Sequence, residues 1–280
     1  MLRKNTYNEL LKIATKIRSY IGVGALTLLI LIVLFAMKVD GKSYVGFVTA
    51  SFEQTLSFNG KILNGNLIAF IILQMLIVHV PLLIALVTGD LISGEEATGS
   101  IRMLVTKPIS RSGIVLSKWF AATIYTLLMT LWLGFLCLFV AKWMFGSGDL
   151  IVLNSGSLLI LSESDLAWRF GLSLGVAFLS LWTVATLSMT FSAFAKNSVG
   201  PIVATMAVII LFTLIGTLDV SVFDSVKPFM FTTHMAAWRI VFEDPFPVYE
   251  IVESVVVLLL HIIVLLAITL YRFNKKDITS

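Results

Sequence analysis

The residues best suited to chemistry in this chain are polar side chains inside long apolar runs. Gln74 and His79 lie in one run and His261 in another. A polar side chain in hydrocarbon is costly, so it often marks an ion or substrate pathway. Gln74 and His79 are separated by about 140° around a helix and need not share a face. Since no aspartate or glutamate lies deep in either run, Glu253 being near the start of the second one, we expect pathway residues or interhelical contacts, and a proton-coupled transporter is an alternative.

A second pattern, G-x-S-x-G, runs from Gly171 to Gly175. It would present Ser173 as a nucleophile if a strand preceded it. The chain also resembles rhomboid intramembrane proteases, which have six spans, a GxS motif in the fourth and a histidine in the sixth. Ser173 and His261 would then form a catalytic dyad. Because Leu174 stands where rhomboids place a glycine, and glycines in spans more commonly pack helices, the protease is an alternative only.

Histidine and cysteine provide no metal motif. His79, His234 and His261 lie in separate segments, without the spacing of a metal site. Cys137 is the single cysteine, so no disulfide can form within the chain. We predict no metal and no catalytic residue.

The most informative polar stretch runs from Thr88 to Phe120. Its order is acidic residues, a glycine, a short amphipathic piece and a basic turn with a proline; the charged and turn residues are Asp90, Glu95, Glu96, Gly99, Lys107, Pro108, Ser110 and Arg111. Proline stops a helix, and Ser110 can cap the next one. A short helix held between two spans could dock on a moving partner and transmit its motion. Alternatively, the charges only set the topology.

The elements that position these residues are membrane spans. Hydrophobic residues make up 58% of the 280 and charged residues 13%, and the mean hydropathy is +0.99, far more apolar than a soluble domain. A helix of roughly 20 residues crosses the hydrocarbon and satisfies its own backbone groups. We predict an all-α integral membrane protein with one transmembrane domain, 1–280, and spans near 19–37, 67–87, 114–140, 168–192, 199–218 and 251–271.

The charge distribution orients the bundle. Thirteen of the twenty Lys and Arg residues fall in the N-terminal tail, in 88–118, at Lys196 and in the C-terminal tail. The positive-inside rule then places both termini in the cytoplasm. Before the first span, apolar residues recur at helical spacing over about 5–18, which predicts an amphipathic elbow helix at the membrane surface. A basic tail that only fixes topology is the alternative.

Two further features concern the spans. Pro81 should kink the second span, because proline removes a helix hydrogen bond. The segment 219–250 combines many aromatic residues with Pro228, Pro245 and Pro247. It is too aromatic for a solvated loop, so we expect short helices at the outer interface, as a lid over an exit path or as plain anchors. Its apolar character favours an amphiphilic substrate.

The stretch from Thr88 to Phe120 resembles the cytoplasmic loop of type-2 ABC exporter permeases. In that family an acidic pair, a Gly-Thr or Gly-Ser step, a hydrophobic helix and a Pro-Ile-Ser-Arg turn followed by lysine recur. The matching residues are Glu95, Glu96, Gly99, Ser100, Leu104, Pro108, Ile109, Ser110, Arg111 and Lys118. The elbow, the six spans, the broken outer segment and the end from Arg272 to Asp277 extend the resemblance over most of the chain.

The resemblance implies a permease of two halves, driven by cytoplasmic ATPase subunits that push on coupling segments. Here the coupling segment would be about 88–113, and its residues would be Glu95, Glu96, Gly99, Ser100, Arg102, Leu104, Pro108, Ser110 and Arg111. Glu95, Glu96 and Arg102 would form the surface that contacts the ATPase. The chain has no G-x-x-x-x-G-K-[ST] loop, so ATP and Mg would belong to the partner.

The same resemblance sets the expected assembly. We expect a homodimer or a heterodimer with a related permease, in the plasma (inner) membrane of a prokaryote. The second and fifth spans would line the pathway, and export is favoured. Membrane lipids are expected partners and nucleic acid is not, while the substrate is not readable from the sequence.

Overall fold

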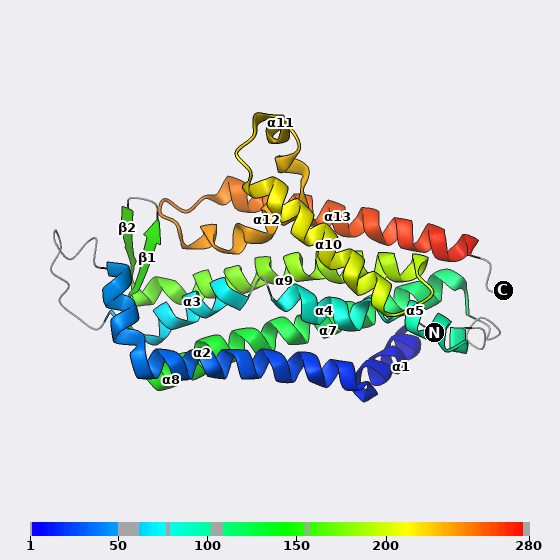
Figure 1. Ribbon diagram of the computed structural model, residues 1–280, viewed down its shortest axis with the longest axis horizontal. Helices are drawn as coiled ribbons and strands as arrows, with labels where there is room; N and C mark the ends of the chain where they lie inside the picture. The colour runs from blue at the N-terminus through cyan, green and yellow to red at the C-terminus, as the bar shows by residue number, and fades with distance from the viewer. Residues whose placement is uncertain (1, 50–61, 77–78, 102–108, 155–156, 277–280) are drawn as a thin grey trace.

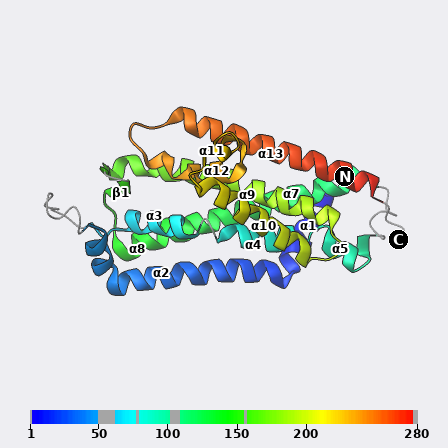
Figure 2. The same ribbon diagram turned by 45° about the horizontal axis from the view of Figure 1, so that its top comes forward.

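The chain folds into an elongated bundle of helices that run mainly along its long axis (Figures 1 and 2). A computed structural model describes residues 2–49, 62–76, 79–101, 109–154 and 157–276. The long helices are α1 (Leu2–Thr15), α2 (Ile17–Thr49), α3 (Gly65–Leu76), α4 (Val80–Thr88), α7 (Arg111–Gly134), α9 (Glu163–Phe194), α10 (Val199–Thr217) and α13 (Val248–Lys275). A π-helical stretch, Phe135–Val140, joins α7 to α8 (Ala141–Phe145).

Short elements complete the described part of the chain. They are α5 (Ser93–Ala97), α11 (Ser221–Asp224), α12 (Phe231–Met235) and the 3-10 turns Lys227–Phe229, Ala236–Trp238 and Ile240–Phe242. The strands β1 (Leu150–Asn154) and β2 (Ser157–Leu161) pair antiparallel, with Leu150 opposite Leu161. This hairpin is a small addition that the all-α prediction did not contain.

The predicted membrane architecture is confirmed. By length and composition, five helices in the described residues can cross a membrane, and the bent pair α3 and α4 makes a sixth if it counts as one span. The third and fourth spans are longer than predicted, covering Arg111–Phe145 and Glu163–Phe194. In the second span, the two helices meet at 53°, and Pro81 lies in the first turn of α4. A kink near Pro81 is therefore present, because proline is tolerated at a helix start and not within a helix.

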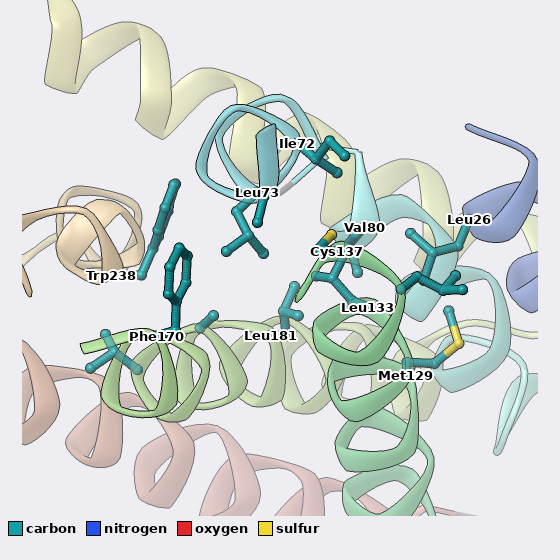
Figure 3. Close-up of a cluster of buried hydrophobic side chains, with 14 of the residues drawn as sticks. Leu26, Ile72, Leu73, Val80, Met129, Leu133, Cys137, Phe170, Leu181 and Trp238 are labelled. Carbon is teal, nitrogen blue, oxygen red and sulfur yellow. The ribbon is translucent and has the colours of Figure 1, made fainter. Parts of the chain in front are cut away.

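Helix α9 forms the centre of the bundle. In its most apolar window 61% of residues are buried, compared with 11% in α10 and 22% in α13. Its buried face is rich in serine and threonine, whose small size lets neighbouring helices approach closely. The hydroxyl groups stay paired in this dry environment; for example, Thr183 donates to the Leu179 carbonyl and Thr190 to that of Thr186. Figure 3 shows part of the surrounding core, where Leu73, Phe170 and Trp238 converge.

The two ends of the bundle differ in character. One end, here called the hairpin end, carries β1 and β2 (Figure 1). The opposite end, here called the α5 end, carries α1, α5, the link between α9 and α10 and the end of α13 (Figure 1). Both ends of the described chain therefore lie together, as an even number of spans requires.

The segment 219–250 contains the expected short helices, but it divides into two parts. Phe229 is 73% exposed and α11 projects from the side of the bundle (Figure 1). Trp238 and Phe242, in contrast, are buried in the core, and the Phe242 ring lies 4.9 Å from that of Phe170. The second part thus packs into the bundle and does not lie on its surface.

Arg169 of α9 fixes this buried part. It is 5% exposed, and its Nη1 donates to the carbonyl groups of Val241 (2.8 Å) and Glu243 (2.9 Å). Its Nε donates to Asp165, at 2.6 Å, and the guanidinium carbon lies 5.7 Å from the centre of the Phe246 ring. One buried cation therefore satisfies two carbonyl groups that have left regular helix.

Replacing Arg169 tests this role. Arg169→Gln should lower the Tm of the purified protein in detergent, because the two carbonyl groups lose a charged donor at a cost of roughly 2–4 kcal/mol. Differential scanning fluorimetry measures the change. Asp224→Asn is the matched control, since Asp224 pairs with Lys227 on the exposed part of the same segment. An Arg169→Gln variant as stable as the control would contradict the assignment.

Candidate coupling site

The residues from Thr88 to Ile101, here called the 88–101 segment, connect the end of α4 to the α5 end of the bundle. After α4 ends, a tight turn that contains Asp90 leads into α5, and the Gly94 amide donates to the Asp90 carbonyl. A Cβ at position 94 would lie 2.2 Å from Asp90 Oδ1, so a larger residue there would displace the Asp90 carboxylate. After α5 the chain reverses at Gly99, whose φ of 71° lies in the left-handed region that glycine adopts without strain. Gly99, one of the predicted coupling residues, therefore terminates α5.

Helix α9 holds the start of α5. Ser192 Oγ accepts hydrogen bonds from the amides of Ile92 (3.2 Å) and Ser93 (2.9 Å), which are free at a helix start. Its own hydroxyl donates to Ser93 Oγ. Ser192 and Ser93 are fully buried, so the 88–101 segment is attached to the central helix of the bundle.

Four alternating charges join the segment to α1 and α7. We call Glu9, Lys12, Glu95 and Lys118 the ion-pair square. Lys118 Nζ lies 2.8 Å from Glu9 Oε2 and 2.7 Å from Glu95 Oε2. The second contact is an ion pair whose angle departs from that of a hydrogen bond. Lys12 Nζ closes the square at 2.5 Å from Glu9 and 2.7 Å from Glu95.

Burial makes these four charges interdependent. Lys118 is only 1% exposed, Glu9 6% and Glu95 8%. A buried charge that loses its partner is strongly destabilising, because its desolvation is no longer compensated. Lys118 belongs to the third span, Glu9 to α1 and Glu95 to α5, so three separate elements must keep their relative positions.

The pKa values follow this arrangement. Burial alone would raise the pKa of the Glu9 carboxyl, but Lys118 and Lys12 outweigh it and hold that pKa below its ordinary 4.5. Burial alone would lower the pKa of the Lys12 ammonium, but hydrogen bonds to Glu9 and Glu95 hold it above 10.5. The charged forms of both groups are therefore the stable ones at neutral pH.

Asp90 makes a second set of ion pairs at the junction of α1 and α2. Lys16 Nζ lies 2.7 Å from its Oδ2, and Arg18 Nη1 lies 2.8 Å from its Oδ1. Burial alone would raise the pKa of Asp90, but Lys16, the Ser198 hydroxyl and Arg18 hold it below its ordinary 3.8. Asp90 thus connects the end of α4 to the first span.

The third acidic residue, Glu96, pairs with the end of α13. Lys276 Nζ contacts Glu96 Oε2 and donates to the Ala193 carbonyl, at 3.1 Å. Arg111 binds the same region, since its Nη1 donates to the carbonyl groups of Asn274 (3.0 Å) and Lys276 (2.8 Å). The acids of the segment thus pair with the N-terminal part of the chain, with the third span and with the C-terminal end.

The other predicted coupling residues have local roles or lie outside the described residues. Ser110 caps α7 as expected, accepting from the Gly113 amide at 3.1 Å. Ser100 Oγ lies 2.8 Å from Thr98 Oγ1 and donates to the Glu95 carbonyl. Arg102, Leu104 and Pro108 lie outside the described residues. Contact of this segment with an ATPase stays a prediction.

Of the three polar residues predicted for the pathway, Gln74 lines cavities. It lies on two of them, of about 310 Å³ and 210 Å³, beside the break in the second span. His79 Nδ1 donates to the Met75 carbonyl at 2.8 Å and so satisfies a backbone group freed at that break. His261 Nδ1 donates to the Val257 carbonyl within its own helix. Both histidines thus have partners within their own spans.

The protease alternative gains no support. Ser173 is buried in α9, and its successor Leu174 packs on Gly134, where a Cβ would lie 2.6 Å from Leu174 Cδ1. Within the described chain no hydrogen bond joins Ser173 to His261, whose ring lies 5.8 Å from that of Phe231. Ser173 and Leu174 therefore face the bundle, whereas Gly171 and Gly175 are exposed with no atom within 4 Å of a Cβ, so the expected packing role of these glycines is not seen in the described chain.

Sequence reasoning missed half of the ion-pair square. Glu9 and Lys12 did not appear among the predicted site residues, although their spacing of three on one helix is a local signal for an ion pair. Lys118 was noticed only as part of a motif. The usable clue was the position of Lys118 within the otherwise apolar predicted span 114–140, because a charge at such a position needs a partner.

The comparisons with known proteins agree with this architecture. The family model described as "ABC-2 family transporter protein" matches residues 12–278. No curated protein matches the sequence. The match covers almost the whole bundle, from α1 to the end of α13, and the chain belongs to the ABC-2 transporter family. Membership makes it a membrane component of a transporter, and implies association with ABC ATPase subunits.

Removing the buried cation tests the ion-pair square. Lys118→Met should destabilise the protein by roughly 3–5 kcal/mol, because Glu9 and Glu95 then face each other in a dry site. Combining it with Glu95→Gln should cost less than the sum of the single changes, since the repulsion disappears. Thermal unfolding in detergent measures both. Lys4→Met, an exposed change on α1, is the control; additivity of the first two changes would disprove the coupling.

Stability should also depend on pH in a defined way. The contribution of Glu9 is complete above 4.5 and is lost as the pH falls through its lowered folded pKa. The contribution of Lys12 is complete below 10.5 and is lost as the pH rises through its raised folded pKa. A Tm series should therefore show the penalty of Glu9→Gln at neutral pH and a smaller penalty in acid. A penalty that grows in acid would contradict the assignment.

Proposed function

We propose that this chain is one of two permease halves of an ATP-driven exporter and that the 88–101 segment receives the motion of cytoplasmic ATPase subunits. ATP and Mg would bind those subunits and not this chain. The observation that carries the proposal is the distribution of the segment's ion pairs. Asp90, Glu95 and Glu96 each pair with different parts of the bundle, so displacement of the segment must move several helices together.

The inward direction of Glu95 refines the expected contact surface. Its carboxylate lies between Lys12 and Lys118, so in this conformation it holds the segment to the bundle. The exposed part of the segment is Ala97 and Thr98, with Gly99 and Ser100 partly exposed. This turn is therefore the surface that we assign to the partner, with Glu95 transmitting the force behind it.

The charge pattern supports an orientation with the α5 end in the cytosol. The residues of this end include the basic ones of α1 and the end of α13, which the positive-inside rule places on the cytoplasmic side. Both termini would then be cytoplasmic, in the plasma (inner) membrane. The hairpin end and the segment 219–250 would face outward.

The pathway that we propose follows the second and fifth spans. Gln74 of α3, Pro81 of α4 and Thr213 of α10 line the same cavity, and α10 packs against α4. Asp90 directly follows α4, which extends about 14 Å from the 88–101 segment to the break in the second span. Motion of the segment would thus reach the cavity through one rigid helix.

Site-directed crosslinking tests the coupling. A cysteine introduced as Thr98→Cys in a Cys137→Ser background should crosslink to an ABC ATPase expressed with the chain, because Thr98 is exposed beside α5. The yield should change when ATP and Mg are added, since ATP closes the ATPase pair. Mass spectrometry of the crosslinked product identifies the partner peptide.

The matched control is Ser162→Cys, an exposed position at the hairpin end, which should give no such crosslink. Glu95→Gln should leave the crosslink in place and lower ATP-dependent transport, because it loosens the segment from α7 without removing the contact surface. Equal crosslinking from positions 98 and 162, or full transport by Glu95→Gln, would refute the proposal.

A further inference from the structure

Two adjoining cavities follow the second span toward the hairpin end. The smaller one, about 210 Å³, is lined by Pro81 of α4 and Thr213 of α10. The other, about 310 Å³, reaches Val152 of β1. Gln74 and Arg239 line both cavities, so these two side chains stand where one cavity passes into the other.

Arg239 is an unpaired cation at this junction. Among the described residues its guanidinium makes no ion pair and no hydrogen bond. Lys227, on the same segment, is paired with Asp224 at 2.9 Å. Arg239 is exposed at this junction, so its charge is available to a negative group that enters the cavities from outside the chain.

Two polar atoms near Arg239 lack a hydrogen-bond acceptor. The indole Nε1 of Trp238 and the hydroxyl of Thr232 are buried and have no hydrogen-bond partner in the described chain, and both residues line the smaller cavity. Trp238 is 1% exposed. An indole N–H and a guanidinium can only donate hydrogen bonds. The ligand that completes this site must therefore present acceptor oxygens.

The remaining walls are apolar and carry one acid. Phe70 and Ile240 line the larger cavity, and Ile209 and Met235 line the smaller one, so an alkyl chain can pack beside the polar junction. Glu243 lines the larger cavity but not the smaller one. Its carboxylate would repel a second negative charge, which favours a ligand with a single one.

From this arrangement we infer that Arg239, with Gln74, Thr232 and Trp238, binds the anionic head of a singly charged amphiphile. A carboxylate, a phosphodiester or a sulfate carries the required chemistry. The inference rests on the proposed function, because it makes this amphiphile the class of substrate that passes along the second and fifth spans. The cavities would receive the head group and the apolar walls its chain.

Direct binding to the isolated chain tests the inference without an ATPase. Radiolabelled dodecanoate is titrated against the protein in nanodiscs, with empty nanodiscs subtracted for partition into lipid. Arg239→Gln should weaken binding roughly tenfold or more, because a charge-assisted hydrogen bond is lost. Arg239→Lys should restore most of the affinity. Lys227→Gln, which removes a cation outside the cavities, should leave it unchanged.

A second variant acts in the opposite direction. Glu243→Gln should tighten dodecanoate binding severalfold, since it removes the repelling charge, so the inference can be tested even if Arg239→Gln does not fold. Competition by dodecyl sulfate below its denaturing concentration or by an alkyl phosphodiester separates the acceptor groups, and dodecyltrimethylammonium should not compete. Equal binding by wild type and Arg239→Gln, weaker binding by Glu243→Gln, or competition by the cation would overturn the inference.

The two proposals fail in different ways. Loss of the Thr98 crosslink with intact, Arg239-dependent binding would remove the ATPase coupling and keep the ligand site. Intact crosslinking with binding that ignores Arg239 and Glu243 would keep the permease assignment and remove the substrate class.

Discussion

The buried ammonium group of Lys118 is the interaction on which the α5 end depends. It lies between the carboxylates of Glu9 and Glu95, at 2.8 Å and 2.7 Å, where little water can replace either partner. Buried ion pairs contribute little net stability compared with apolar packing, but breaking one is expensive. They therefore fix the relative position of α1, α5 and α7 more than they strengthen the fold. A transport protein needs this property where force must pass between elements.

The membrane imposes a second constraint, because hydrocarbon offers no hydrogen bonds to backbone groups that leave regular helix. The structure meets it with specific side chains at each irregularity. His79 binds a carbonyl at the break of the second span, and Arg169 binds two where the segment 219–250 enters the bundle. His234 does the same further along, donating to the Pro228 carbonyl and accepting from Ser254. Polar residues in these spans are thus mostly structural.

Against this background, the few unsatisfied polar groups become informative. In the described residues near the second span, they include Asn66 Oδ1 at the start of α3 and, at the two cavities, Thr232 and Trp238, beside the cation of Arg239. The cavity groups lie beside the break in the second span, and α4 connects this break to Asp90 and the ion pairs of the α5 end. The same helix therefore borders both the proposed coupling segment and the proposed binding site.

Hydropathy, helical spacing and local residue type were sufficient to predict an all-α membrane protein, the approximate places of its candidate spans, the kink near Pro81 and the cap at Ser110, because each depends on residues close together in the chain. The motif around Glu95 was sufficient for the family. Tertiary structure alone showed that Glu95 points inward, since its partners Lys12 and Lys118 come from other helices and one of them lies 83 residues away in sequence. It also brought Arg239 to Gln74. Such pairings depend on how the helices pack, and packing is decided by surface shape across the whole bundle and not by the local order of residues.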